Sequence, residues 1–89
     1  IVLPDRVTPW AATTFDALTD EDMAPLAELD RDVVLLATGP RLRFPRPEIL
    51  RRLTEARIGV EVMDVAAACR TYNILVAEDR RVACAVLLV

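Results

Sequence analysis

Residues 60–73 read Val-Glu-Val-Met-Asp-Val-Ala-Ala-Ala-Cys-Arg-Thr-Tyr-Asn, and this stretch decides the fold. Its first four residues, apolar apart from Glu61, are typical of a short strand. Asp64 is placed to cap the Ala-rich helix that follows. The stretch ends in 70–73, the densest run of polar donors in a chain that has no His, Ser, Gln or Lys. If the chain has a specific site, we expect it here.

A second apolar run, Val33–Ala37, predicts a strand that is covered on both faces. A helical pattern with one apolar face follows it. We expect that helix to begin near Pro47 and to end at Gly59, acting as a left-handed cap. The order strand, helix, glycine, strand indicates a βαβ unit with parallel strands.

The first thirty residues predict short, irregular elements. Ile1–Leu3 and Arg6–Thr8 are typical of extended segments. Thr19, followed by acids, is a good helix start, but Pro25 removes a backbone donor inside that helix. We therefore expect a short, irregular helix that ends by Asp30.

The end of the chain predicts two more strands. Ile74–Ala77 and Val82–Val89 are aliphatic and are separated by the polar residues 78–81, which favours a hairpin. The predicted fold class is therefore α/β, a three-layer single domain over residues 1–89. Its central sheet is mixed and mainly parallel, and its last strand is antiparallel.

Composition excludes several functions. A net charge of −3 and only four aromatic residues argue against nucleic-acid binding. No apolar run approaches the roughly 20 residues that span a bilayer, so we expect no membrane insertion. Without His or a Cys pair at ligand spacing, we expect no metal and no cofactor. Cys69 and Cys84 are interpreted as free thiols in a reducing cytoplasm, which is the predicted location.

Charge is unevenly distributed along the chain. Residues 16–32 carry seven acids and one Arg, whereas residues 41–57 carry six Arg and two Glu. One interpretation is two solvated helical faces. The other is a pair of complementary patches used in self-association or partner docking.

The polar residues of the predicted strand ends suggest where a ligand or partner would bind. Gly39 follows a buried strand and has Arg41 and Arg43 nearby, which hints at an anion site. Neither dinucleotide-binding nor P-loop spacing is met, however, and a plain strand-exit turn is the alternative. Arg70 is the natural counter-charge for Glu61 or Asp64. We predict no catalytic residue. The candidate ligand or partner site comprises Thr38, Gly39, Glu61, Asp64, Arg70, Thr71, Tyr72 and Asn73.

Several stretches together resemble a small family of unknown function. The family includes mitochondrial complex I assembly factor 3 and the adipogenesis-associated Mth domain proteins. The resemblance covers nearly the whole chain and rests on residues 33–39, Pro45, 58–64, 67–75, Glu78 and 80–83. Asp79 stands where the family usually has a turn Gly. The family domain normally begins with a β-hairpin some two dozen residues earlier, so we expect N-terminal residues to be missing here.

The resemblance implies an Mth-type fold and a non-enzymatic binding or assembly module that contacts another protein. The alternative is a protein, or a minor enzyme, that binds an anionic or carbonyl-bearing small molecule in a pocket around Thr38, Arg70 and Tyr72. A third hypothesis is a self-associating unit, a homodimer formed through an exposed edge strand.

Overall fold

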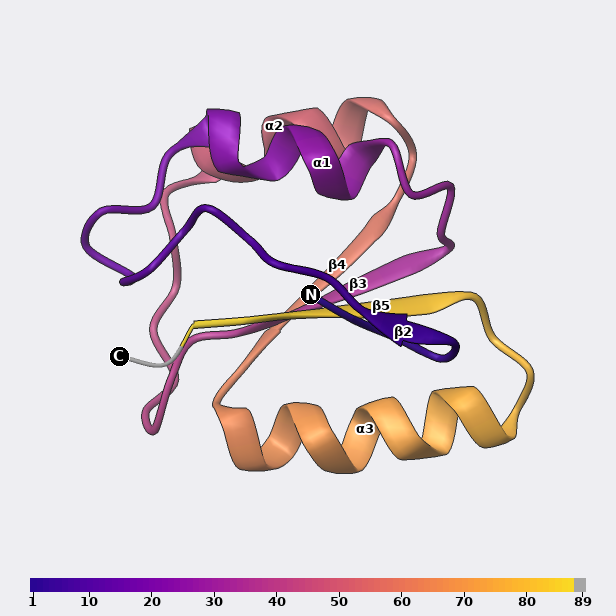
Figure 1. Cartoon of the computed structure of the whole chain (residues 1–89). Helices are drawn as coiled ribbons and strands as arrows, with labels where there is room; N and C mark the ends of the chain where they lie inside the picture. Colours follow the sequence, from indigo (N-terminus) through magenta and orange to yellow (C-terminus); the bar gives the residue numbers. More distant parts are fainter. Residues whose placement is uncertain (88–89) are drawn as a thin grey trace.

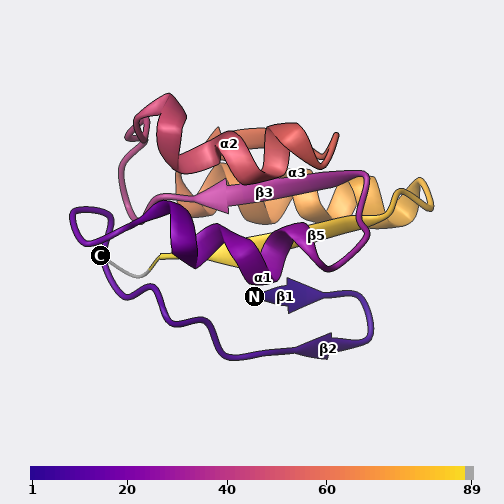
Figure 2. The same ribbon diagram turned by 90° about the horizontal axis from the view of Figure 1, so that it is seen from above.

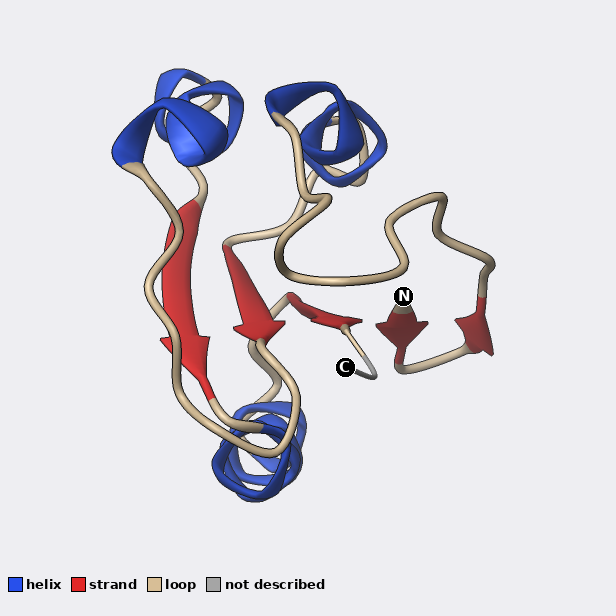
Figure 3. Cartoon of the chain, turned by 90° about the vertical axis from the view of Figure 1, so that its left-hand side faces the viewer, coloured by secondary structure: helices blue, strands red, loops and turns tan. Residues whose placement is uncertain are grey.

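Five strands form one mixed sheet in the order β2-β1-β5-β3-β4. The structure is a computed structural model that describes residues 1–87. Two short helical elements and α2 (Pro47–Glu55) cover one face of the sheet, and α3 (Val65–Ala77) covers the other (Figures 1 and 3). The predicted three-layer α/β fold with a mixed sheet is thus confirmed. The strands are β1 Val2–Leu3, β2 Arg6–Val7, β3 Val33–Ala37, β4 Gly59–Met63 and β5 Val82–Val86.

Strand β3 lies at the centre of the core and explains the continuous apolar run. It pairs in parallel with β4 on one side and with β5 on the other. Every residue of β3 is buried, because alternate side chains enter two separate apolar clusters. Val34 and Leu36 pack in the cluster beneath α2, whereas Leu35 packs in the cluster beneath α3.

The helical layer over the first cluster begins as predicted. A 3₁₀ turn, η1 (Asp20–Met23), leads directly into a single α turn, α1 (Ala24–Ala27). This is the short, irregular helix expected from Pro25. The indole N–H of Trp10 donates to the Asp22 carbonyl at 2.7 Å and holds the N-terminal segment against this layer. The third element of the layer is α2, Pro47–Glu55.

The predicted cap at Gly59 is wrong. Helix α2 ends earlier, because Arg57 adopts the left-handed conformation with φ 61°. The N–H groups of Arg57 and Ile58 then bond to carbonyls of the last helical turn, at 3.0 and 2.9 Å. Gly59 is instead the first residue of β4.

The predicted strand at 74–77 and the hairpin after it are also wrong. Helix α3 runs from Val65 to Ala77 and includes this segment. Ala68, Tyr72, Leu75 and Val76 follow one another at helical spacing and all pack in the second cluster. Burial of this face overrides the strand preference of the aliphatic run.

Helix α3 returns the chain to the end of the sheet at which β3 begins, so β5 runs parallel to β3 and is antiparallel only to β1. The predicted antiparallel orientation of the last strand therefore holds only against β1. Asp79, with φ 59°, makes the turn after α3. Residues 88–89 of the predicted strand 82–89 lie outside the described residues. Strands β1 and β2 form an antiparallel hairpin at the edge of the sheet (Figure 2).

Candidate functional site

The carboxyl ends of β3 and β4 meet the start of α3, as expected for an α/β sheet. The Asp64 carboxylate accepts a bond from the Ala67 N–H at 2.8 Å and caps α3. The Val65 N–H donates to the Gly39 carbonyl at 2.9 Å. Gly39 has φ 95°, a conformation that side chains disfavour, so its identity follows from the turn. The structure therefore brings together three of the predicted site residues, Thr38, Gly39 and Asp64.

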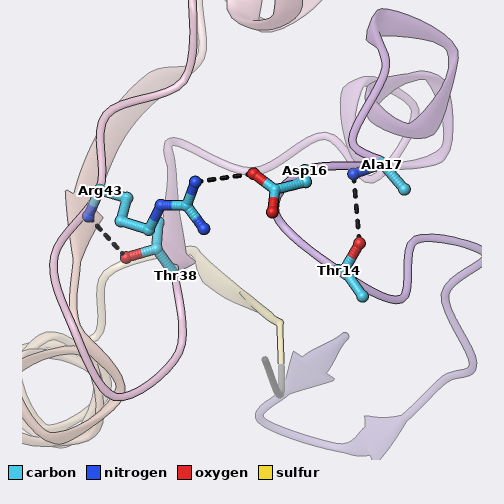
Figure 4. Close-up of polar contacts among 5 residues, drawn as sticks. All are labelled: Thr14, Asp16, Ala17, Thr38 and Arg43. Atoms are coloured by element: carbon cyan, nitrogen blue, oxygen red, sulfur yellow. Dashed lines mark hydrogen bonds and ion pairs between the residues drawn. The ribbon is translucent and has the colours of Figure 1, made fainter.

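The Thr38 hydroxyl is occupied by the loop that follows β3. It lies 2.8 Å from the Arg41 carbonyl and 3.2 Å from the Met63 carbonyl, either of which can accept its one hydrogen. It also accepts a bond from the Arg43 N–H at 3.1 Å (Figure 4). Thr38 is only 2% exposed, and these bonds satisfy the buried hydroxyl. Its side chain fixes the exit turn of β3.

Arg43 points toward the body of the domain. Its guanidinium lies 2.7 Å from the Asp16 carboxylate (Figure 4). The same group lies 4.1 Å from the centroid of the Phe15 ring. Thr14 stabilises the turn that carries Asp16, because its hydroxyl accepts the Ala17 N–H at 3.2 Å. The loop after β3 is therefore tied to the segment that precedes η1.

The predicted pairing of Arg70 with an acid is not found among residues 1–87. The ion pairs there join other residues, and both Arg70 and Glu61 are exposed. Glu61 lies on β4, an edge strand, so its carboxylate can stay in water. Arg70 lies on the outer face of α3. No buried partner is needed for either charge.

Tyr72 and Asn73 lie in a different place from Thr38. They line a hollow of about 190 Å³ between α3 and the strands, together with Val2, Cys69, Cys84 and Val86. Thr38 lines another hollow, of about 210 Å³, with Pro40, Arg41 and Arg43. The predicted residues are thus divided between two hollows, and Thr71 is a half-buried residue of α3.

The hollow beneath α3 raises the pKa of two groups. Burial raises the pKa of the Cys84 thiol from 9.0 to about 11, and the neighbouring Cys69 adds to this shift. Desolvation also raises the pKa of the Tyr72 phenol; Cys84 and Asp5 add to this shift, and Arg31 opposes it. Both groups are neutral at pH 7. Cys84 is therefore not a thiolate nucleophile, whereas Cys69 is exposed.

A surface that sequence reasoning missed lies on the outer face of α3. Six exposed side chains follow one another at helical spacing, and only one of them is charged. Ile74 is 58% exposed at the centre of the second half of this face. The spacing would have shown it, had residues 74–77 been assigned to the helix. We define the α3 outer face as Ala66, Cys69, Arg70, Asn73, Ile74 and Ala77.

The opposite charges noted in the sequence meet within the molecule. Arg43 pairs with Asp16, and Arg52 pairs with Asp20 at 3.6 Å. A groove of about 710 Å³ between η1 and α2 is lined by side chains of both signs. Two of the seven acids in residues 16–32 therefore form ion pairs with arginines of residues 41–57 in the same chain.

Residues 1–87 contain no group of three or more His, Cys, Asp or Glu side chains arranged to hold a metal ion. Over the same residues, no helix has the length and apolar character needed to cross a membrane.

The fold and these residues define a class of protein. It is a small three-layer α/β domain in which the polar residues at the strand ends form hydrogen bonds within the domain. The chain belongs to the family described as proteins of unknown function, DUF498/DUF598, whose model matches residues 1–87. The family resemblance seen in the sequence is confirmed.

Named relatives and solved structures agree with this assignment. Bovine NADH dehydrogenase [ubiquinone] 1 alpha subcomplex assembly factor 3 is 32% identical over 81 residues, which cover 89% of this chain and 44% of the relative. A Xanthomonas campestris protein is 39% identical with a TM-score of 0.86, over 98% of this chain and 67% of that one. A Bordetella pertussis protein described as a Mth938-like domain is 36% identical with a TM-score of 0.75, over 92% and 67%. The chain spans about half the length of the curated relatives it matches.

Proposed function

We propose that this domain is a non-enzymatic binding or assembly module that acts through protein–protein contacts. The observation that carries the proposal is its similarity to complex I assembly factors over 89% or more of its length. The same proposal includes a cytoplasmic location and a role in assembling a larger protein complex.

The chemistry of the candidate site supports this proposal. The Thr38 hydroxyl is hydrogen-bonded within the exit turn of β3, and the Asp64 carboxylate caps the start of α3. Cys84 is buried and protonated at neutral pH. These residues stabilise the domain and supply no acid, base or nucleophile poised for a reaction.

The α3 outer face is the surface we assign to the partner. An exposed helix normally carries charged residues on its solvent side, but this face holds one charge among six residues. Ile74 supplies an apolar anchor, and Arg70 and Asn73 supply polar contacts beside it. Arg is enriched and most other charged residues are depleted at the centres of protein interfaces.

The proposal can be tested by affinity capture from cells that naturally contain the protein. We compare Ile74→Asp with Val7→Asp, because Val7 is also an exposed aliphatic residue but lies on β2, outside the α3 outer face. A stoichiometric protein partner should be captured by the wild type and by Val7→Asp but lost with Ile74→Asp. In addition, disruption of the gene should lower the amount of assembled respiratory complex I on native gels.

A second candidate function is binding of a small carbonyl-bearing molecule. It rests on the hollow of about 190 Å³ lined by Tyr72 and Asn73. Native mass spectrometry of the purified protein distinguishes the two. A bound small molecule lost in Asn73→Ala, with no protein partner in the capture experiment, would replace the assembly proposal.

A further inference from the structure

The loop that joins β3 to α2 exposes its apolar residues. We define loop 40–46 as Pro-Arg-Leu-Arg-Phe-Pro-Arg. Leu42 is 48% and Phe44 is 74% exposed, whereas Arg43 between them is half-buried. A segment on a protein surface usually places its cations outward and its aromatic residues inward. In loop 40–46 both large apolar side chains are exposed, and only one of the three arginines, Arg43, is half-buried.

Specific contacts hold the loop in this arrangement. Asp16 keeps the Arg43 side chain against the domain, and the Thr38 hydroxyl accepts the Arg43 N–H (Figure 4). The Arg43 guanidinium also lies over the Phe15 ring. Pro40 and Pro45 limit the backbone on either side. The outward position of Leu42 and Phe44 is therefore built into the fold.

The loop is also strongly cationic. It contains three arginines and no acid, in a chain of net charge −3. Asp16 neutralises Arg43, while Arg41 and Arg46 are exposed and belong to none of the ion pairs described for residues 1–87. The hollow of about 210 Å³ beside Arg41 has room for a phosphate-sized anion. Apolar and cationic groups thus project from one loop.

This combination fits the surface of an anionic bilayer. Aromatic and aliphatic side chains enter the boundary between headgroups and acyl chains, and arginines attract the lipid phosphates. The side chains of loop 40–46 include no hydroxyl, amide or carboxylate, so they offer little directional recognition to a folded protein. Binding to the mobile phosphates of a fluid bilayer does not require directional recognition. The acidic remainder of the domain would keep other faces away from such a surface.

We propose that loop 40–46 docks the domain peripherally on membranes that contain anionic phospholipids. Phe44 and Leu42 enter the headgroup boundary, and Arg41 and Arg46 contact phosphates. The contact is reversible, because a single short loop gives a weak membrane anchor. This inference is independent of the proposed protein contact, which uses the α3 outer face.

The test is flotation of the full chain with lipid vesicles. One set contains phosphatidylcholine alone, and the other contains phosphatidylcholine mixed with phosphatidylglycerol. The protein should float only with the anionic vesicles, and raised salt should release it. Phe44→Ser should weaken binding about tenfold. The double variant Arg41→Gln/Arg46→Gln should weaken it about twenty-five-fold, from about fivefold for each arginine.

Matched variants separate these effects from general changes. Val7→Ser removes an aliphatic residue that is as exposed as Phe44. Arg57→Gln/Arg80→Gln removes the same charge at the opposite end of the parallel strands, just before β4 and β5. Both controls should bind anionic vesicles like the wild type, and circular dichroism should show that all variants are folded.

Three outcomes would overturn the proposal. The first is absence of flotation with either vesicle, and the second is equal flotation with neutral and anionic vesicles. The third is undiminished binding by Phe44→Ser. If vesicles do not bind but Phe44→Ser weakens a protein complex, the loop is a protein interface and the membrane proposal is wrong.

Discussion

Helices α2 and α3 cover opposite faces of one sheet, yet their solvent sides differ completely. The exposed residues of α2 include two acids and two arginines, and Arg52 pairs with Asp20 of the neighbouring turn. The exposed residues of α3 include one arginine among small and apolar side chains. A charged outer side suits a helix whose outer side faces water, whereas an outer side with few charges suits a helix that binds a partner there.

The inner sides of the two helices differ as well. Leu53 of α2 is a large side chain that is 1% exposed and fills the cluster above Val34 and Leu36. Helix α3 approaches the sheet through Ala68, which is 0% exposed. The α2 layer is thus stabilised by large buried side chains, whereas at Ala68 the backbone of α3 packs closely against the sheet.

The largest effect should come from Leu53→Ala. Removing a buried leucine leaves a cavity and should lower the free energy of unfolding by about 2–5 kcal/mol. Urea denaturation followed by circular dichroism measures the change. Leu50→Ala, at a half-buried position of the same helix, is the control and should cost clearly less. Equal costs would show that the α2 layer does not depend on this one side chain.

The next largest effect should come from Ala68→Leu. The added atoms have no space between α3 and the sheet, so the free energy of unfolding should fall by about 1–3 kcal/mol. Ala66→Leu, on the exposed side of the same helix, should stay within about 0.5 kcal/mol of the wild type. A well-tolerated Ala68→Leu would contradict close packing of α3.

A smaller effect should appear at alkaline pH beneath α3. The pKa of Cys84 is about 11 in the folded protein against 9.0 in an ordinary thiol, so the folded state holds the proton more tightly. Stability should therefore fall as pH rises from 9 towards about 11, by about 1 kcal/mol midway. Urea midpoints across this range, compared with Cys84→Ala, isolate the contribution.

Thiol labelling gives an independent readout of the same difference. At neutral pH the exposed Cys69 should react much faster with an aromatic disulfide than the buried Cys84. Cys69→Ala should remove the fast phase alone. Two thiols that react equally fast would contradict the burial of Cys84.

The smallest effect should come from the ionic side of α2. The Arg52–Asp20 pair is separated by 3.6 Å and both side chains are about half-exposed. Asp20→Asn should therefore change the free energy of unfolding by less than about 1 kcal/mol. A double-mutant cycle with Arg52→Gln measures the coupling, which high salt should reduce. A larger coupling that persists in salt would assign α2 a structural ion pair.

The sequence predicted the elements whose pattern is local. The run Val33–Ala37 is continuous because β3 is buried on both faces, and Pro25 shortened the helix as expected. The aliphatic run 74–77 misled the prediction because strand preference and helical spacing coincide there. Arg57 could replace glycine at the end of α2 since the helix-ending hydrogen bonds compensate its left-handed backbone.

The candidate site was harder to predict because it depends on which helix face each residue occupies. Thr38 and Asp64 meet at strand ends, as sequence order suggested. Arg70 and Tyr72 are two positions apart on α3, so Arg70 faces outward and Tyr72 faces the sheet. Grouping them in one site overlooked that residues at this spacing lie on nearly opposite sides of a helix.

The most direct test of the difference between the two helices is photo-crosslinking in living cells. A photoreactive residue is placed at Ile74 on α3 in one variant and at Arg51 on the exposed side of α2 in another. We expect one discrete protein adduct from position 74 and none from position 51. A discrete adduct from position 51, or none from position 74, would contradict the assignment of the α3 outer face as the binding surface.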